Sequence, residues 1–92
     1  MNEGDLVPYL LVFDYKSPMF KRIDEYLKNT NPIDLNIVFI SSPWLFKLKE
    51  KSWKYNKIYF VNSAELKTNG LVKMYYRSEK GAIVSRNVID IM

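Results

Sequence analysis

The polar residues with the clearest place for chemistry in this 92-residue chain stand at the ends of its apolar runs. Asp14 directly follows the apolar stretch 6–13, a position where some phosphotransfer folds hold an acidic nucleophile. In open α/β sheets, ligands gather beyond the carboxyl ends of the parallel strands. A second acid is missing from the same loop, so we predict no catalytic role for Asp14 and no catalytic residue elsewhere.

Three serines beside two expected helix starts are candidate anion ligands, because free N–H groups and the positive end of a helix dipole point there. Ser17 precedes Pro18, and Ser41 and Ser42 precede Pro43. A serine hydroxyl also caps a helix by accepting from a backbone N–H, and proline suits the first helical position. Capping alone is therefore the alternative interpretation. No glycine-rich loop accompanies the serines, which argues against a P-loop or Rossmann nucleotide site.

The chain contains no cysteine and no histidine. This excludes disulfides, thiol catalysis, zinc sites built from those residues, and Ser-His or Cys-His catalytic pairs. No group of aspartate and glutamate residues has the spacing of a metal-binding loop. We therefore predict no metal, no cofactor and no enzymatic activity.

The net charge is +4, and the two halves of the chain contribute to it unequally. Residues 1–46 hold four basic and six acidic side chains, whereas residues 47–92 hold ten basic and four acidic ones. A basic half could attract nucleic acid, an anionic surface or an acidic partner. The alternative is a solvated, lysine-rich face with no electrostatic partner.

A basic and aromatic segment, residues 44–59, carries the nucleic-acid interpretation. Lysines contact phosphates, and aromatic rings stack on unpaired bases. In the competing interpretation, Trp44 and Trp53 pack on the sheet and the lysines solvate the outer side of a helix. The candidate nucleic-acid ligands are Lys47, Lys51, Lys54, Lys57, Trp53 and Tyr55, of which the first three lysines share a helix face.

Strands and helices are expected to alternate along the chain. Phe20, Ile23 and Leu27 repeat at helical spacing, and the Ile- and Val-rich run 35–40 is typical of a buried strand. Gly81 suits the positive φ that a hairpin turn often needs. In order, we expect strand 6–13, helix 18–28, strand 35–40, helix 44–55, and strands 57–61, 71–77 and 82–91.

This β-α-β-α-β-β-β order predicts a single α/β domain over residues 1–92, built on a small mixed sheet. The first three strands should be parallel, since a helix long enough for a crossover joins each to the next. The last two should form an antiparallel hairpin at the sheet edge. Helices on one or both faces would make this a two-layer or three-layer sandwich.

Part of the pattern resembles a thioredoxin-like domain. A strand, a helix start and a second strand follow one another in residues 12–40 as they do in that superfamily, which has a Cys-Pro-X-Cys or Cys-X-X-Cys motif where Ser17 to Phe20 stand here. Residues 72–81 are similar to the hairpin of the membrane-anchored thiol–disulfide reductase branch, which begins with a cis-proline where Val72 stands. With both cysteines replaced, the resemblance implies a redox-inactive scaffold that binds a partner. A generic α/β domain explains the same pattern.

Two helices are few for a five-stranded sheet. If both crossovers lie on the same face, the other face stays open. An open face beside an unpaired edge exposes apolar surface. We therefore predict a non-enzymatic module that acts through protein–protein contacts or self-association, with nucleic-acid binding by segment 44–59 as the alternative. The predicted partner-binding residues are Val88, Ile89, Ile91 and Met92.

The sequence also bears on location. The longest apolar run, residues 9–13, is too short to span a bilayer. Glu3 and Asp5 stand where a signal peptide would carry basic residues. We expect a cytoplasmic protein with no membrane span, whose partner is another protein or a second copy of itself.

Overall fold

The computed structural model describes residues 6–30, 34–53, 56–66 and 68–86, and it contains five strands and two helices. The predicted small mixed α/β domain is confirmed at this level. The elements in chain order are β1 (Val7–Asp14), α1 (Phe20–Thr30), β2 (Asn36–Ser41), α2 (Pro43–Ser52), β3 (Lys57–Asn62), β4 (Val72–Arg77) and β5 (Ile83–Arg86).

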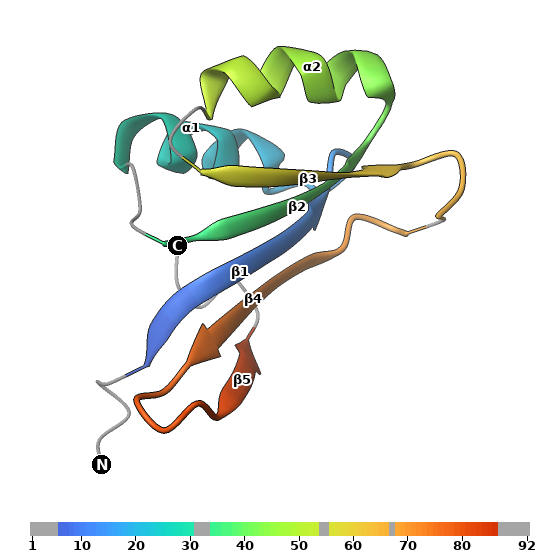
Figure 1. Ribbon diagram of the computed structural model, residues 1–92. Coiled ribbons are helices and arrows are strands. Elements are labelled where there is room, and N and C mark those ends of the chain that lie inside the picture. The colour runs from blue at the N-terminus through green and yellow to red at the C-terminus, as the bar shows by residue number, and fades with distance from the viewer. Residues whose placement is uncertain (1–5, 31–33, 54–55, 67, 87–92) are drawn as a thin grey trace.

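One sheet holds all five strands in the order β3-β2-β1-β4-β5 (Figure 1). β1, β2 and β3 are parallel to one another, and β4 and β5 are antiparallel to their neighbours. The parallel part arises because a helix carries the chain back to the starting end of the sheet after each of the first two strands. In the antiparallel part, the segment between β3 and β4 leads the chain to the other side of β1, where β4 runs back antiparallel to it, and a short turn joins β4 to β5.

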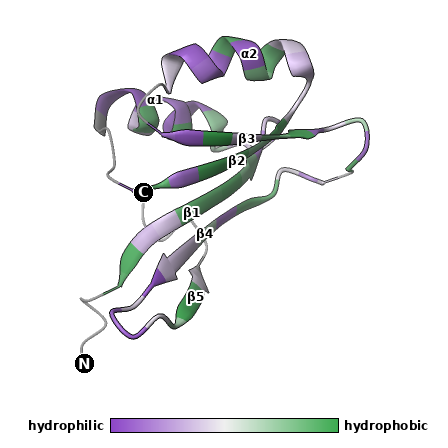
Figure 2. Ribbon diagram, viewed as in Figure 1, coloured by the Kyte–Doolittle hydropathy of each residue, from purple (hydrophilic) through white to green (hydrophobic). Residues whose placement is uncertain are grey.

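Both helices lie on the same face of the sheet (Figure 1). The chain steps from β1 to β2 and from β2 to β3 in one direction across the sheet. Two right-handed crossovers made in the same direction place their helices on the same side. Among the described residues the domain therefore has two layers, one of helices and one of strands, and apolar residues dominate the central strands (Figure 2).

The core fills the space between these two layers. Alternate residues of β1 and β2 point toward the helices, and the register places Leu11 beside Ile37 and Phe13 beside Phe39, all four of them buried. The helical spacing of α1 adds Ile23 and Leu27, as the sequence indicated, and Trp53 enters just after α2.

Aromatic rings form the centre of this core. The ring centroids of Phe13 and Phe39 are 4.9 Å apart, and that of Trp53 lies 5.0 Å from Phe39. Phe20 of α1 stacks on Phe39 at 5.7 Å. Such rings bury a large area each, so four of them supply much of the apolar burial that a short chain needs.

Most element boundaries differ from the sequence prediction by one or more residues. α1 begins at Phe20 rather than residue 18, because residues 18 and 19 form a separate turn. α2 ends at Ser52, short of the predicted residue 55, where the N–H of Trp53 closes the helix on the carbonyl of Lys49. β5 is described only to Arg86, and the rest of the predicted strand 82–91 lies outside the described residues.

Candidate functional site

Asp14 ends β1 at the rim where ligands gather in open α/β sheets, yet its carboxylate is fully engaged by the protein's own chain. It is 1% exposed. Its Oδ1 accepts from the backbone N–H of Lys16 at 3.0 Å, and its Oδ2 accepts from the N–H of Gly70 at 3.4 Å and from the hydroxyl of Thr68. The side chain thus ties the segment between β3 and β4 to the end of β1.

The same segment approaches the turn after β1 closely. Gly70 has a φ of +74°, and a Cβ there would lie 3.3 Å from the Cα of Ser17. A side chain at this position would be strained and crowded, which explains the glycine. The backbone N–H of Asp14 donates to the carbonyl of Leu71 at 2.9 Å, so main chain and side chain hold the segment together.

The three serines predicted as anion ligands serve local structure instead. The hydroxyl of Ser17 accepts from the N–H of Met19 at 3.1 Å, and that of Ser42 accepts from the N–H of Leu45 at 3.3 Å. Ser41 is fully buried, and its hydroxyl donates to the carbonyl of Ser42 at 2.9 Å. Ser42 thus caps α2, as the capping interpretation expected, whereas Ser17 supports a turn before α1 and Ser41 bonds to a neighbouring carbonyl.

Trp53 does not lie where the nucleic-acid interpretation needs it. Its indole is 0% exposed and packs among the core phenylalanines, and its Nε1–H donates to Oδ1 of Asp24 at 2.9 Å. The prediction that Trp53 stacks on bases is therefore wrong, because α2 ends one residue earlier and the chain turns back toward the sheet there. Lys54 and Tyr55, two further candidates, lie outside the described residues.

No local sequence signal indicated the polar link between the two helices, in which Trp53 takes part. Oδ2 of Asp24 on α1 lies 3.1 Å from Nζ of Lys28 and 3.2 Å from Nζ of Lys49 on α2. Burial by itself raises the pKa of Asp24, but the indole N–H and the two ammonium groups more than offset it and hold that pKa below its ordinary value. The spacing of Lys28 was visible in sequence; the approach of Lys49 required the packed helices.

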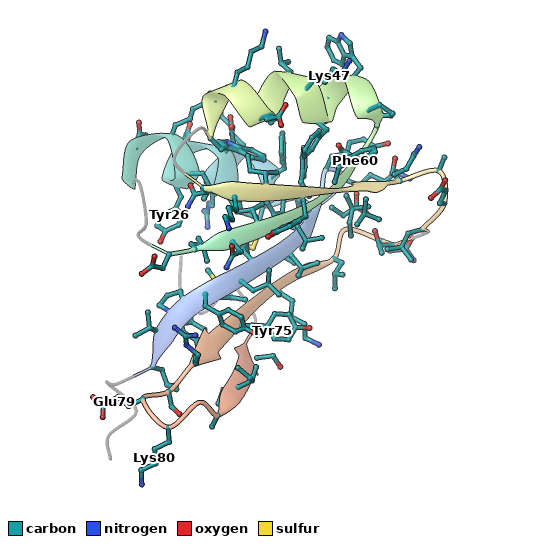
Figure 3. All side chains as sticks on the ribbon, viewed as in Figure 1. Tyr26, Lys47, Phe60, Tyr75, Glu79 and Lys80 are labelled. Atoms are coloured by element: carbon teal, nitrogen blue, oxygen red, sulfur yellow. The ribbon has the colours of Figure 1, made fainter. Side chains whose placement is uncertain are left out.

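The outer side of α2 carries the remaining basic candidates. Lys47 and Lys51 are exposed there, as the shared helix face predicted, and Lys47 points away from the sheet (Figure 3). Trp44, which is 73% exposed, and Leu48 lie on the same stripe, since residues three and four apart are helix neighbours. The prediction that Trp44 packs on the sheet is wrong. Lys57 is exposed at the start of β3.

The face of the sheet opposite the helices is only partly covered, and it combines apolar side chains with those of Lys57, Lys73 and Arg77. We call it the open face. Near the rim, where the segment before β4 is tied down, Asp14 and Ile40 are buried. Elsewhere the side chains are half-buried, and Tyr59 is 52% exposed. By strand register the apolar residues of the open face include Leu10, Val12, Val38, Ile40, Tyr59, Val61, Tyr75 and Ile83.

A cleft of about 480 Å³ lies at the other end of β1. The guanidinium of Arg77 lies over the ring of Tyr9, 5.9 Å from its centroid, and Asp34 and Glu79 line the same cleft. The hydroxyl of Ser78 accepts from the N–H of Ala82 at 3.1 Å, so it has a structural partner. Three separate segments contribute the lining of this cleft, which is why no sequence motif indicated it.

The part of the chain that the structure describes shows neither a membrane-spanning helix nor a metal-binding cluster. No described helix is long and apolar enough to cross a bilayer. Within the same residues, no three acidic side chains come together in a way that could hold a metal ion. The predicted partner-binding residues Val88, Ile89, Ile91 and Met92 lie outside the described residues.

The arrangement therefore offers two solvent-facing surfaces, the open face and the outer side of α2, and a rim that is occupied by the protein itself. Comparison with known proteins adds no relative: no protein-family model matches the chain, and neither the curated proteins nor the solved structures contain a match.

Proposed function

We propose that this protein is a non-enzymatic binding module that works through protein–protein contacts, with the open face as its contact surface. The proposal is supported above all by the placement of both helices on one face of the sheet, which leaves apolar side chains of the other face accessible. Removal of these apolar side chains from water would favour association with a partner.

The absence of catalysis in this proposal is supported by what the polar residues of the rim already do. The carboxylate of Asp14 accepts three hydrogen bonds from its own chain, and the nearby serine hydroxyls are engaged in turns and caps. With neither cysteine nor histidine present, the protein has no thiol or imidazole to act as nucleophile or base.

We also propose that the scaffold is a redox-inactive relative of thioredoxin-like domains. Ser17 and Phe20 stand where the cysteines of that superfamily would be. Here the Ser17 hydroxyl supports a turn, and the Phe20 ring stacks on Phe39 in the core. Both positions thus have structural roles that need no sulfur chemistry.

A photo-crosslinking comparison tests the contact surface. Val38 lies in the middle of the open face, and Lys21 is an exposed residue of α1 on the covered side. Val38→Cys and Lys21→Cys, each coupled to benzophenone maleimide, would be irradiated in native lysate. We expect a discrete adduct only from position 38, and excess unlabelled protein should compete with it. The same adducts from both positions would refute the open face as the contact surface.

Nucleic-acid binding is the second candidate, and the stripe on α2 favours it. Lys47 and Lys51 supply two cations beside an exposed indole, that of Trp44, which could stack on an unpaired base. Binding of single- and double-stranded oligonucleotides would be titrated against salt. Retention that weakens steeply with salt, and that Trp44→Ala reduces for single strands, supports this function; no retention even at low salt removes it.

A further inference from the structure

Among the described residues, β3 is an edge strand with no segment paired to its outer side. β3 lies at one end of the sheet order, and the only described strand beside it is β2. Its sequence, Lys-Ile-Tyr-Phe-Val-Asn, is rich in β-branched and aromatic residues and holds no proline, no glycine and a single charge. Natural sheets usually guard such edges with charges, prolines, bulges or a covering segment, because free backbone groups pair with other strands.

The backbone groups that point outward from β3 can be assigned from its ladder. The N–H of Ser63, one residue past β3, donates to the carbonyl of Ser41 at 2.9 Å, so this residue directs its donor toward β2. Successive residues of a strand direct their backbone groups alternately to its two sides. Ile58 and Phe60 therefore present their N–H and C=O groups to the free edge.

The side chains at this edge are apolar on both faces of the sheet. Tyr59 is 52% exposed on the open face, and Phe60 is 38% exposed on the helix face, where its ring lies 5.0 Å from that of Phe46 (Figure 3). A strand added here would cover both rings at once. Within the described residues, the other edge strand, β5, has four residues against the six of β3.

We propose that two copies of this protein pair through β3, antiparallel, about a two-fold axis perpendicular to the sheet. This inference goes beyond the proposed function, which assigns the open face rather than the edge of β3 as the contact surface. A two-fold axis makes the same patch serve both partners and makes the two edge strands antiparallel. The result is one continuous sheet of twice five strands, with the helices of both copies on the same side.

The register of the pairing follows from the free groups and from charge. With Tyr59 opposite its symmetry mate, Ile58 faces Phe60 of the second copy, and these two residues exchange their outward N–H and C=O groups. Lys57 then faces Val61 rather than a second Lys57, which avoids opposed like charges. The two Tyr59 rings meet on the open face, where aromatic cross-strand pairs are stabilising.

A single-cysteine test suits a chain that has no cysteine of its own. In an antiparallel non-hydrogen-bonded pair the Cα atoms lie about 4.5 Å apart, within the range of a disulfide. We expect Tyr59→Cys to form a covalent dimer under mild oxidation and to revert with reductant. Ile83→Cys, which is similarly exposed but lies on β5, is the matched control and should remain monomeric.

A second variant disrupts the pairing without disturbing the fold. Tyr59→Lys places two ammonium groups opposite each other across the axis, and the exposed position tolerates the change. Sedimentation equilibrium should show at least a tenfold weaker dimer than the unmodified protein, with an unchanged circular dichroism spectrum. Ile83→Lys, which adds the same charge on β5, should leave the dimer constant unchanged.

Three outcomes would overturn the proposal. They are a monomer at about 1 mM, cross-linking of Tyr59→Cys no faster than that of Ile83→Cys, and a disulfide formed by Phe60→Cys instead, which would require a different register. A specific adduct from Val38 without a cross-link at Tyr59 would sink the β3 pairing and leave the binding module standing. The reverse result would place self-association at the edge and reject the open face.

Discussion

The two faces of the central strands differ in burial. Along β1, Leu11 and Phe13 point to the helices and are buried, whereas Leu10 and Val12, which alternate with them, point to the open face and are half-buried. All four are apolar, so composition does not separate the faces. The difference comes from the crossovers, which put both helices on one side.

A strand can therefore have a sequence that is typical of burial on both faces, although the described residues cover only one of its faces. Strands buried on both faces have continuous apolar runs. β1 and β2 have such runs, but the chain supplies helices for a single face. The unused apolar face is what makes a partner plausible on physical grounds, since large exposed apolar patches mark interaction sites.

The largest expected effect compares neighbouring residues of β2 that point to opposite faces. Phe39→Ala should lower the free energy of unfolding by about 3–5 kcal/mol, because it empties the centre of the aromatic core. Val38→Ala, on the open face, should cost about 1 kcal/mol or less, since its side chain is only half-buried. Urea denaturation monitored by circular dichroism measures both. Equal losses would mean that the two faces are equally packed.

The second largest effect is expected at the rim end of the open face, where Asp14 binds the segment before β4. Asp14→Ala removes a buried acceptor and leaves the N–H groups of Lys16 and Gly70 without it, so we expect a loss of about 1–3 kcal/mol. Hydrogen exchange at the Gly70 amide should speed up at the same time. Asp34→Asn, an exposed carboxylate in a loop, is the control and should change neither quantity. An unchanged exchange rate of the Gly70 amide would contradict the role of Asp14 in holding the segment before β4.

A smaller effect concerns the link between the helices on the covered face. Because the folded pKa of Asp24 lies below its ordinary value, its contribution to stability is present above about pH 4 and is lost as the pH falls through the folded pKa. Asp24→Asn should be less stable than the unmodified protein at pH 7, and the difference should shrink in acid. Thermal melts between pH 2 and pH 7 measure it, and a difference independent of pH would rule this link out.

The smallest effect is expected on the outer side of α2. Lys47→Glu with Lys51→Glu should change the free energy of unfolding by no more than about 0.5 kcal/mol, because both side chains are exposed and no ion pair is described for either. Denaturation of the double variant measures it. A loss above 1 kcal/mol would assign these lysines a structural role and weaken their place in a binding surface.

Sequence reasoning recovered the elements more readily than the sites. The helical stripe of Phe20, Ile23 and Leu27 and the Ser42-Pro43 start of α2 are local signals, and both were visible. The fate of Trp53 was not, because it depends on where α2 ends and on a carboxylate 29 positions away in the chain. The same holds for Asp14, whose partners Thr68 and Gly70 come from another loop.

The amino-acid sequence by itself determined that this protein is a small mixed α/β domain without thiol or imidazole chemistry. Helical spacing and capping residues are local signals, and the lack of cysteine and histidine is a matter of composition. Neither requires knowledge of the tertiary structure. Only the tertiary structure decided which polar groups are occupied and which surfaces remain free. Whether a polar group is hydrogen-bonded depends on the approach of segments distant in sequence. At the rim, Asp14 binds the segment before β4, whereas the described residues leave the open face and the edge of β3 exposed.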